Sequence, residues 1–316
     1  MKRRILKGKL RFGERKMKVN AGFVKMLIES KTPVRVVANK VLDVWLGKLQ
    51  EKISEFYYKG EEEVKEFEEF VLKSFGEFYY TLAKTCVNAP SVIQKNVNDI
   101  CFVVMDGMSF REGALVYDML KKEGYEVRIG YGFSAVPSDT HCFREKLDVS
   151  IDDFKEIKSH KNIRVSGRER YIWSYFPDIM LDRIKVGHAV ISSLEEMYEI
   201  TAKIVKTLVE KLDARRIVVL SDHGYIRSEA GFVFSVSGKA KKQLQEIFGA
   251  KRFVPMDDID LSELVNMGYV MECAGYYVAK SRYVWPVKGR YSIYLHGGLS
   301  LMECLTPVIE VVKAGE

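Results

Sequence analysis

The sequence lacks the features that mark membrane-spanning and disulfide-rich proteins. No stretch approaches the ~20 consecutive apolar residues that a transmembrane helix needs, and the basic first residues are not followed by the apolar core of a signal peptide. The five cysteines are widely spaced and form no C-x-x-C pair, which argues against a disulfide framework and against a zinc ribbon. We therefore expect a cytoplasmic protein with no membrane span and with reduced, buried cysteines.

Positive charge, by contrast, is concentrated at one end of the chain. Residues 1–18 carry nine Lys or Arg against one Glu, whereas the formal net charge of the whole chain is +7. We treat residues 1–19 as a basic arm. Such an arm suits contact with nucleic acid, anionic lipid or an acidic partner, and it is equally explained as a solvated tail.

The next region, residues 20–95, has the apolar periodicity of helices. Apolar side chains recur at three- and four-residue steps from Pro33 to Tyr58 and again from Val64 to Leu82, which predicts an antiparallel helical hairpin. The break is expected at "KGE", where Gly60 would supply the turn. The aromatic stripe of this hairpin is most simply core, although the hairpin could also bind a protein partner.

From residue 96 onward, short apolar runs alternate with longer helical stretches. This rhythm predicts an α/β domain, residues 96–316, built on a mainly parallel sheet flanked by helices. The expected strands and helices follow as residue ranges. Strands are expected at 100–105, 125–131, 171–176, 216–220 and 306–312, helices at 109–123, 193–212, 239–248 and 260–267, and extra strands within 231–236 and 269–287.

Polar side chains that follow directly on apolar runs are the first candidates for a site, because ligands bind beyond the carboxyl ends of parallel strands. Three places qualify: Asp106 in "VVMDG", Asp222 with His223 in "VVLSDHG", and His296 in "YLHGG". Each alone is easily explained as a cap or a structural residue. Together they deliver Asp, Asp-His and His to one edge of one sheet, which favours a metal site.

The segments "VVMDGMSFREG", "LSDHGY" and "HGGLSLMECLTPVIEV" resemble the PglZ domain, a branch of the alkaline phosphatase superfamily, over roughly residues 98–316. The resemblance implies an alkaline-phosphatase-like fold and a metal-dependent hydrolase of phosphate esters. It implies that one ion is held by Asp106, Asp222, His223 and the hydroxyl of the nucleophile. In "PSDT" we expect Thr140 to supply this hydroxyl, with Ser138 as the alternative; both could instead cap a helix.

For a second ion the resemblance implies an Asp, a His four residues later, and a late His. His296 matches the late His and His188 in "KVGH" the earlier one, but Ile184 stands four residues before His188. Asp182 is expected to replace the missing ligand, with Asp178 farther away. The resemblance thus implies two divalent ions, and the mixed Asp and His shell indicates Zn²⁺ or Mn²⁺ rather than Ca²⁺.

Two arginines near these loops, Arg111 and Arg227, are candidates for contact with phosphate oxygens. The leading hypothesis is a phosphodiesterase or nuclease-like enzyme, acting on a phosphate ester that could be a nucleotide or nucleic acid, in a phage-defence or signalling system. The alternative is a PglZ-fold binding or scaffold module with a decayed second metal site. A dinucleotide-binding domain is disfavoured, because "DGMSFREG" is not the G-x-G-x-x-G pattern.

Overall fold

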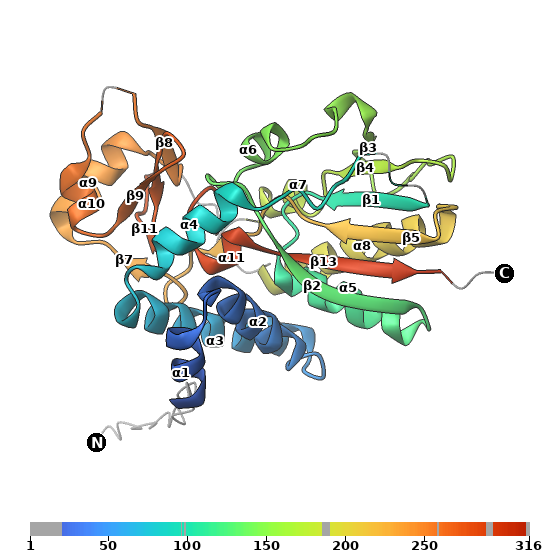
Figure 1. The fold of residues 1–316 in the computed structure, drawn as a ribbon, viewed down its shortest axis with the longest axis horizontal. Helices are drawn as coiled ribbons and strands as arrows, with labels where there is room; N and C mark the ends of the chain where they lie inside the picture. The colour runs from blue at the N-terminus through green and yellow to red at the C-terminus, as the bar shows by residue number, and fades with distance from the viewer. Residues whose placement is uncertain are drawn as a thin grey trace, which may run out of the picture.

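The structure is a computed structural model that describes residues 21–95, 97, 99–184, 190–257, 259–288 and 293–313. The basic arm and His188 lie outside the described residues. The centre of the molecule is a sheet with the strand order β2-β13-β5-β1-β4-β3 (Figure 1). Its strands are β1 (Ile100–Met105), β2 (Glu126–Phe133), β3 (Lys155–Ile157), β4 (Tyr171–Ser174), β5 (Arg216–Leu220) and β13 (Leu305–Val312).

The sheet is mainly parallel, which confirms the predicted fold class. β1 pairs in parallel with β4 and β5, and β3 pairs in parallel with β4, whereas β13 runs antiparallel to both β5 and β2. The central strands β1 and β5 are buried almost throughout, as expected for strands covered on both faces. Their carboxyl ends therefore meet at one edge of the sheet.

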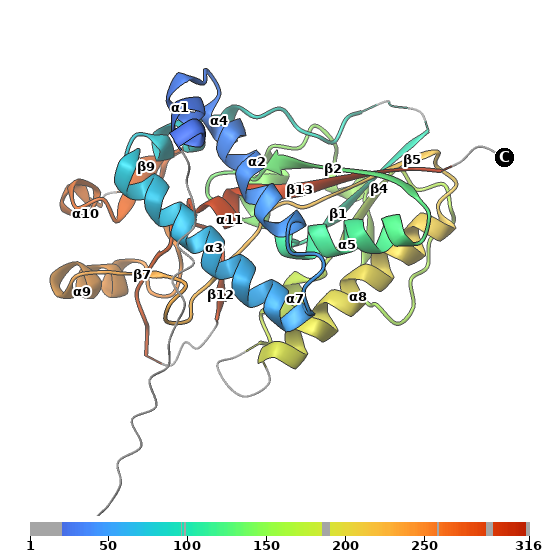
Figure 2. The same cartoon turned by 90° about the horizontal axis from the view of Figure 1, so that it is seen from below.

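Helices cover one face of this sheet. α5 (Phe110–Lys122) and α8 (Val190–Lys211) lie side by side along it (Figure 2), and a core that includes Val103, Val116 and Leu208 fills the interface. The short helix α6 (Thr140–Glu145) and the loops around it cover the opposite face, where Phe143 packs against Trp173.

Four helices precede the sheet: α1 (Ala21–Glu29), α2 (Pro33–Leu46), α3 (Ile53–Ser74) and α4 (Phe78–Asn88). The prediction of a turn at Gly60 was wrong, because α3 runs through this glycine and the chain reverses between α2 and α3 instead. A Cβ on Gly60 would lie 2.1 Å from Cζ3 of Trp45. Glycine is needed there for the close approach of two helices, not for a turn.

A smaller substructure lies at one end of the sheet, on the left in Figure 1. It contains the antiparallel sheet β8-β10-β9 with two helices and two short strand pairs. The elements are β6 (Ile226–Arg227), β7 (Phe234–Ser235), α9 (Gly238–Ile247), β8 (Phe253–Pro255), α10 (Ser262–Asn266), β9 (Val270–Cys273), β10 (Tyr276–Ala279), β11 (Tyr283–Val284) and β12 (Tyr294–Leu295). None of the described helices is long and apolar enough to cross a membrane.

Candidate active site and metal centre

Two aspartates lie at the carboxyl ends of the adjacent strands β1 and β5. Asp222 is fully buried, and its Oδ1 accepts hydrogen bonds from the backbone N–H of Gly107 (3.0 Å) and of His223 (2.9 Å). Gly107 has a φ of +70°, so the chain turns sharply after Asp106 at a conformation that suits glycine. These bonds fix the carboxylate of Asp222 with its Oδ2 free for another partner.

That partner is Thr140, the first residue of α6. Its Oγ1 lies 2.6 Å from Oδ2 of Asp222 and 3.2 Å from Oδ1 of Asp106. The indole Nε1 of Trp173 donates to the other oxygen of Asp106 at 3.2 Å. The hydroxyl of Ser138, in contrast, donates to the carbonyl of Gly298 (2.7 Å) and accepts from another backbone N–H. Of the two hydroxyls, the structure brings Thr140 to the carboxylates.

The imidazole of His223 faces the same two carboxylates. Its Nδ1 lies 2.9 Å from the carbonyl of Gly224, so this nitrogen carries a proton, and its Nε2 is buried with no hydrogen-bond partner among the described residues. Nε2 lies 3.7 Å from Oδ1 of Asp106 and from Oδ2 of Asp222. A backbone carbonyl on one ring nitrogen with the other nitrogen free is the arrangement of metal-bound histidines.

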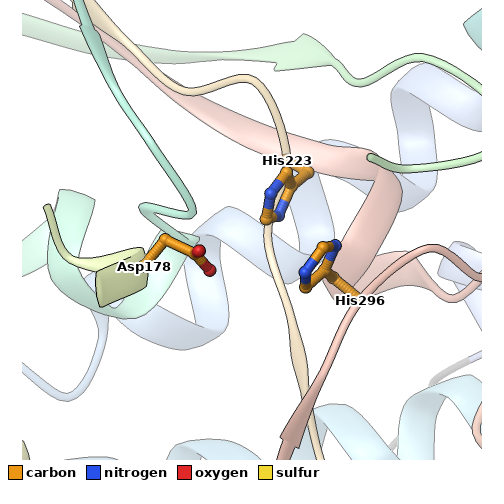
Figure 3. Close-up of side chains that lie close together, drawn as sticks. All are labelled: Asp178, His223 and His296. Atoms are coloured by element: carbon orange, nitrogen blue, oxygen red, sulfur yellow. The ribbon is translucent and has the colours of Figure 1, made fainter. Parts of the chain in front are cut away.

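A second group adjoins the first and consists of Asp178, His223 and His296 (Figure 3). The two imidazoles are stacked, with ring centroids 4.1 Å apart and an interplanar angle of 11°. Asp178 begins the short helix α7 (Asp178–Leu181), and its N–H donates to the carbonyl of Asp106 at 3.0 Å. In each of the two groups the possible ligand atoms lie within 4.8 Å of one another.

The charges of this site are not balanced within the protein. Burial, together with the charge of Asp222, raises the pKa of Asp106 to about 8, and burial raises the pKa of Asp178. Burial opposes protonation of His223, but the carboxylates of Asp222 and Asp106 outweigh it and raise the pKa of His223 to about 9. Burial and the neighbouring His223 lower the pKa of His296. A divalent cation would neutralise these carboxylates and bind the free nitrogen, so the donor set fits a metal.

Of the ligands predicted for a second ion, His296 belongs to the second group and Asp182 does not. Asp182 is exposed at the end of α7 and belongs to neither group, whereas Asp178, one helical turn earlier, belongs to the second. Ile184, which stands where an Asp was sought, is buried among apolar side chains. His188 lies outside the described residues.

The two arginines predicted to bind phosphate lie in different surroundings. Arg111 is 1% exposed, and its guanidinium donates to Glu61 (2.8 Å) and to the carbonyl of Tyr225 (3.0 Å). Because this charge is already paired inside the core, the prediction that Arg111 contacts substrate is not supported. Arg227 on β6 is partly exposed, pairs with Glu229 and stacks on Phe232.

Two residues of this region were not selected from the sequence. Asp178 follows the apolar run of β4, so the rule that found Asp106 would also have found it. Arg144 lies one turn after Thr140 on α6, with its guanidinium 4.3 Å from the ring centre of Trp173 and with no ion-pair partner among the described residues. No sequence signal separates this arginine from the others.

With this geometry in view, the chain was compared with known proteins. The model of the BREX system PglZ alkaline phosphatase-like domain matches residues 141–311, which is more than half of the chain. The chain belongs to the PglZ family. The resemblance seen in the sequence is thereby confirmed. The PglZ match includes Asp178, Asp222, His223 and His296, while Asp106 and Thr140 precede it.

One PglZ relative is the alkaline phosphatase-like protein PglZ of Bacillus cereus (strain H3081.97), with 26% identity over 175 residues. The aligned stretch covers 53% of this chain and 20% of that protein, so the chain spans about a fifth of its relative. Among solved structures, phosphonoacetate hydrolase from Sinorhizobium meliloti 1021 in complex with phosphonoformate gives a TM-score of 0.35 at 13% identity, covering 71% of this chain and 90% of that one. The same enzyme with phosphonoacetate gives a TM-score of 0.24 at 15% identity, covering 44% of each chain.

Proposed function

We propose that this chain is a metal-dependent hydrolase of phosphate esters that uses Thr140 as its nucleophile and two divalent ions, Zn²⁺ or Mn²⁺. The observation that carries this proposal is the contact of the Thr140 hydroxyl with Asp222 (2.6 Å) and Asp106 (3.2 Å). A threonine hydroxyl enclosed by two buried carboxylates is a reactive group in a site that needs a cation. Membership of an alkaline phosphatase-like family supports the same chemistry.

The residues that would hold the ions follow from the two groups. Asp106, Thr140, Asp222 and His223 would hold one ion, and Asp178 and His296 would contribute to the second, with His188 and Asp182 as further candidates. When bound, such ions would lower the pKa of the threonine hydroxyl and offset the negative charge of the phosphate and leaving group. Mixed carboxylate and imidazole donors suit Zn²⁺ or Mn²⁺.

The protein's own part in the reaction is to orient the attack. Asp222 holds the Thr140 hydroxyl by accepting its hydrogen bond, so that an oxygen lone pair is free to attack phosphorus. The bond from Oγ1 to phosphorus forms as the ester bond to the leaving group breaks, and the threonine proton passes to the carboxylate or to solvent. Water then attacks the phosphothreonine, the bond from phosphorus to Oγ1 breaks, and the hydroxyl is restored.

We favour a phosphodiester substrate, such as a nucleotide or a nucleic acid. Arg144 and Arg227 are the side chains proposed to contact its phosphate oxygens, and the basic arm of residues 1–19 would attract a polyanion. A role in a phage-defence or signalling system, and a protein partner bound through the helices of residues 20–95, belong to the same proposal. Membership of the family of BREX system PglZ alkaline phosphatase-like domains supports a role of this kind.

The test combines metal analysis with a panel of chromogenic mono- and diesters. We expect two bound ions per chain, hydrolysis with a preference for diesters, and loss of turnover in Thr140→Ala but not in Ser138→Ala. Activity that survives in Thr140→Ala and disappears in Ser138→Ala would show that the wrong hydroxyl was chosen. Protein that stays metal-free and inert with added Zn²⁺ or Mn²⁺ would refute the enzyme and support the alternative of a binding or scaffold module.

A further inference from the structure

The short helix α11 (Leu301–Cys304) contacts both loops that carry the stacked histidines. It directly follows the loop of His296, and the carbonyl of Glu303 accepts the N–H of Gly224, the residue after His223, at 3.0 Å. A Cβ on Gly224 would lie 2.1 Å from the carbonyl oxygen of Met302. The loop after β5 therefore rests on the backbone of this helix, at a distance that only glycine allows.

The side chain of Glu303 contacts the other loop. Its Oε1 accepts the N–H of Gly298 at 2.7 Å, and its Oε2 accepts the N–H of Ser300 at 3.2 Å, while the hydroxyl of Ser300 accepts the N–H of Glu303 in return. This capping box is buried completely. One residue thus binds the loop after His223 through its main chain and the loop after His296 through its carboxylate.

The carboxylate of Glu303 is itself fixed by Arg252. Nε of Arg252 lies 2.7 Å from Oε1 and Nη2 lies 3.0 Å from Oε2, a bidentate pair with both residues at most 2% exposed. A Cβ on Gly298 would lie 2.5 Å from two nitrogens of this guanidinium, so the loop lies directly on it. Charge-assisted, two-point bonding of this kind is strong and restricts orientation.

The contacts of the His296 ring to other groups are weaker. Its Nδ1 lies 3.3 Å from the carbonyl of Ser138 and 4.0 Å from the carboxylate of Asp139. The position of this imidazole relative to His223, with ring centroids 4.1 Å apart (Figure 3), therefore depends mainly on how the two loops are joined. The pairing of β12 with β6, Leu295 with Ile226, joins the strands that flank these loops, and Glu303 adds bonds to Gly224 and Gly298, which lie beside the histidines themselves.

We propose that Glu303, held by Arg252, is a positioning residue that sets the spacing of His223 and His296 and thereby the geometry of the second ligand group. The expected effect on metal binding rests on the proposed function, whereas the effect on the spacing of the two imidazole rings does not. Glu303 acts through the backbone of the two loops. It touches neither the reacting hydroxyl nor the ligand atoms.

The test compares Glu303→Gln with Glu310→Gln. Both changes remove one carboxylate from an arginine pair, but the carboxylate of Glu310 on β13 pairs with Arg216 at the start of β5 and not with a histidine loop. In Glu303→Gln an NH₂ group replaces one of the two carboxylate oxygens. Each oxygen accepts from an N–H group of the loop, and an NH₂ group cannot accept in its place, so one bond to the loop must weaken. Histidine ring resonances are recorded by NMR in both variants without metal, and Mn²⁺ is titrated by calorimetry.

We expect Glu303→Gln to shift the ring signals of His223 and His296, because stacking places each ring in the ring current of the other, and to weaken Mn²⁺ binding at least tenfold. Glu310→Gln should leave both readouts unchanged. Unshifted ring signals in folded Glu303→Gln would overturn the proposal.

If Glu303→Gln does not fold, Ser300→Ala, which removes only the hydroxyl of the capping box, must shift the same signals, or the proposal fails. Wild-type protein that binds neither Mn²⁺ nor Zn²⁺ would refute the proposed function, and the ring signals would still decide the positioning role.

Discussion

Two buried clusters of charged side chains among the described residues differ in their charge, and only one of the two is balanced. The first, which we call the ionic cluster, consists of Glu61, Glu68, Arg111 and Arg282. In it Arg111 donates to Glu61 at 2.8 Å and Arg282 donates to Glu68 at 2.7 Å. Two carboxylates meet two guanidiniums, so the ionic cluster needs no outside ion, and it fastens α3 to the rest of the protein.

The second, the carboxylate cluster, consists of Asp106, Asp178, Asp222, His223 and His296. No Lys or Arg of the described residues forms an ion pair with any of its three carboxylates. The pKa values show the contrast. Burial would raise the pKa of Glu61, but Arg111 and Arg282 hold it below its ordinary value, whereas the pKa of Asp106 rises to about 8. The pKa of a buried carboxylate is therefore lowered where the fold supplies a guanidinium and raised where it does not.

The largest expected effect is on the carboxylate cluster. Asp222→Asn keeps the Oδ1 acceptor for the N–H groups of Gly107 and His223 but removes one negative charge. We expect a loss of turnover on the order of 10³-fold or more and loss of bound metal. The stability of the metal-free protein should change little, because the lost repulsion between Asp222 and Asp106 and the lost attraction of Asp222 for His223 offset each other. Diester hydrolysis, metal analysis and thermal unfolding measure the three effects. Turnover within tenfold of wild type would contradict the assigned site.

The ionic cluster should respond in the opposite way, through stability. Glu61→Ala leaves Arg111 buried without its carboxylate, and we expect the free energy of unfolding to fall by about 3–5 kcal/mol. Urea denaturation measures this loss. Glu63→Ala on the same helix is the control, because Glu63 is 31% exposed in its pair with Lys48 and should cost about 0–1 kcal/mol. Equal losses in the two variants would mean that the ionic cluster does not stabilise the fold.

Much of the fold could be predicted because its signals are local. Apolar runs such as "ICFVVM" and "RIVVL" are strands in the structure, and the helix expected at 193–212 is α8, which begins three residues earlier, at Val190. Two features depended on partners far away in sequence. The antiparallel direction of β13 is set by the strands beside it, and Gly60 lies against Trp45 on another helix. Neither partner can be read from the local pattern.

Part of the candidate site could likewise be predicted from local sequence patterns, and part could not. Asp106, Asp222 and His223 come together because adjacent parallel strands end at the same edge, which the sequence pattern already implies. The spacing from His188 points to Asp182 rather than Asp178, but the turn after β4 decides which aspartate lies near His296, and that aspartate is Asp178. The burial of Arg111 came from its pairing with Glu61, fifty residues earlier, and no local pattern predicts such a pair.

The smallest expected effect is the pH dependence of the metal-free protein. The folded-state pKa of Asp106, about 8, lies above the unfolded value of about 3.9, and that of His223, about 9, lies above about 6.5. The folded state therefore binds more protons than the unfolded state between pH 7 and 8.5, so stability falls as pH rises through this window. His296, with a lowered pKa, titrates below the window and does not oppose this slope.

We expect the melting temperature of metal-free protein to fall by roughly 2–5 °C from pH 7 to 8.5. Bound Mn²⁺ should reverse the trend, because ligand deprotonation strengthens metal binding as pH rises. In Asp222→Asn the slope should flatten, since the charge that raises both pKa values is gone. Differential scanning calorimetry with and without EDTA measures all three. A melting temperature that stays level or rises in wild-type, metal-free protein would show that the carboxylate cluster is balanced by groups of the protein itself, as the ionic cluster is, and would remove the electrostatic argument for a bound cation.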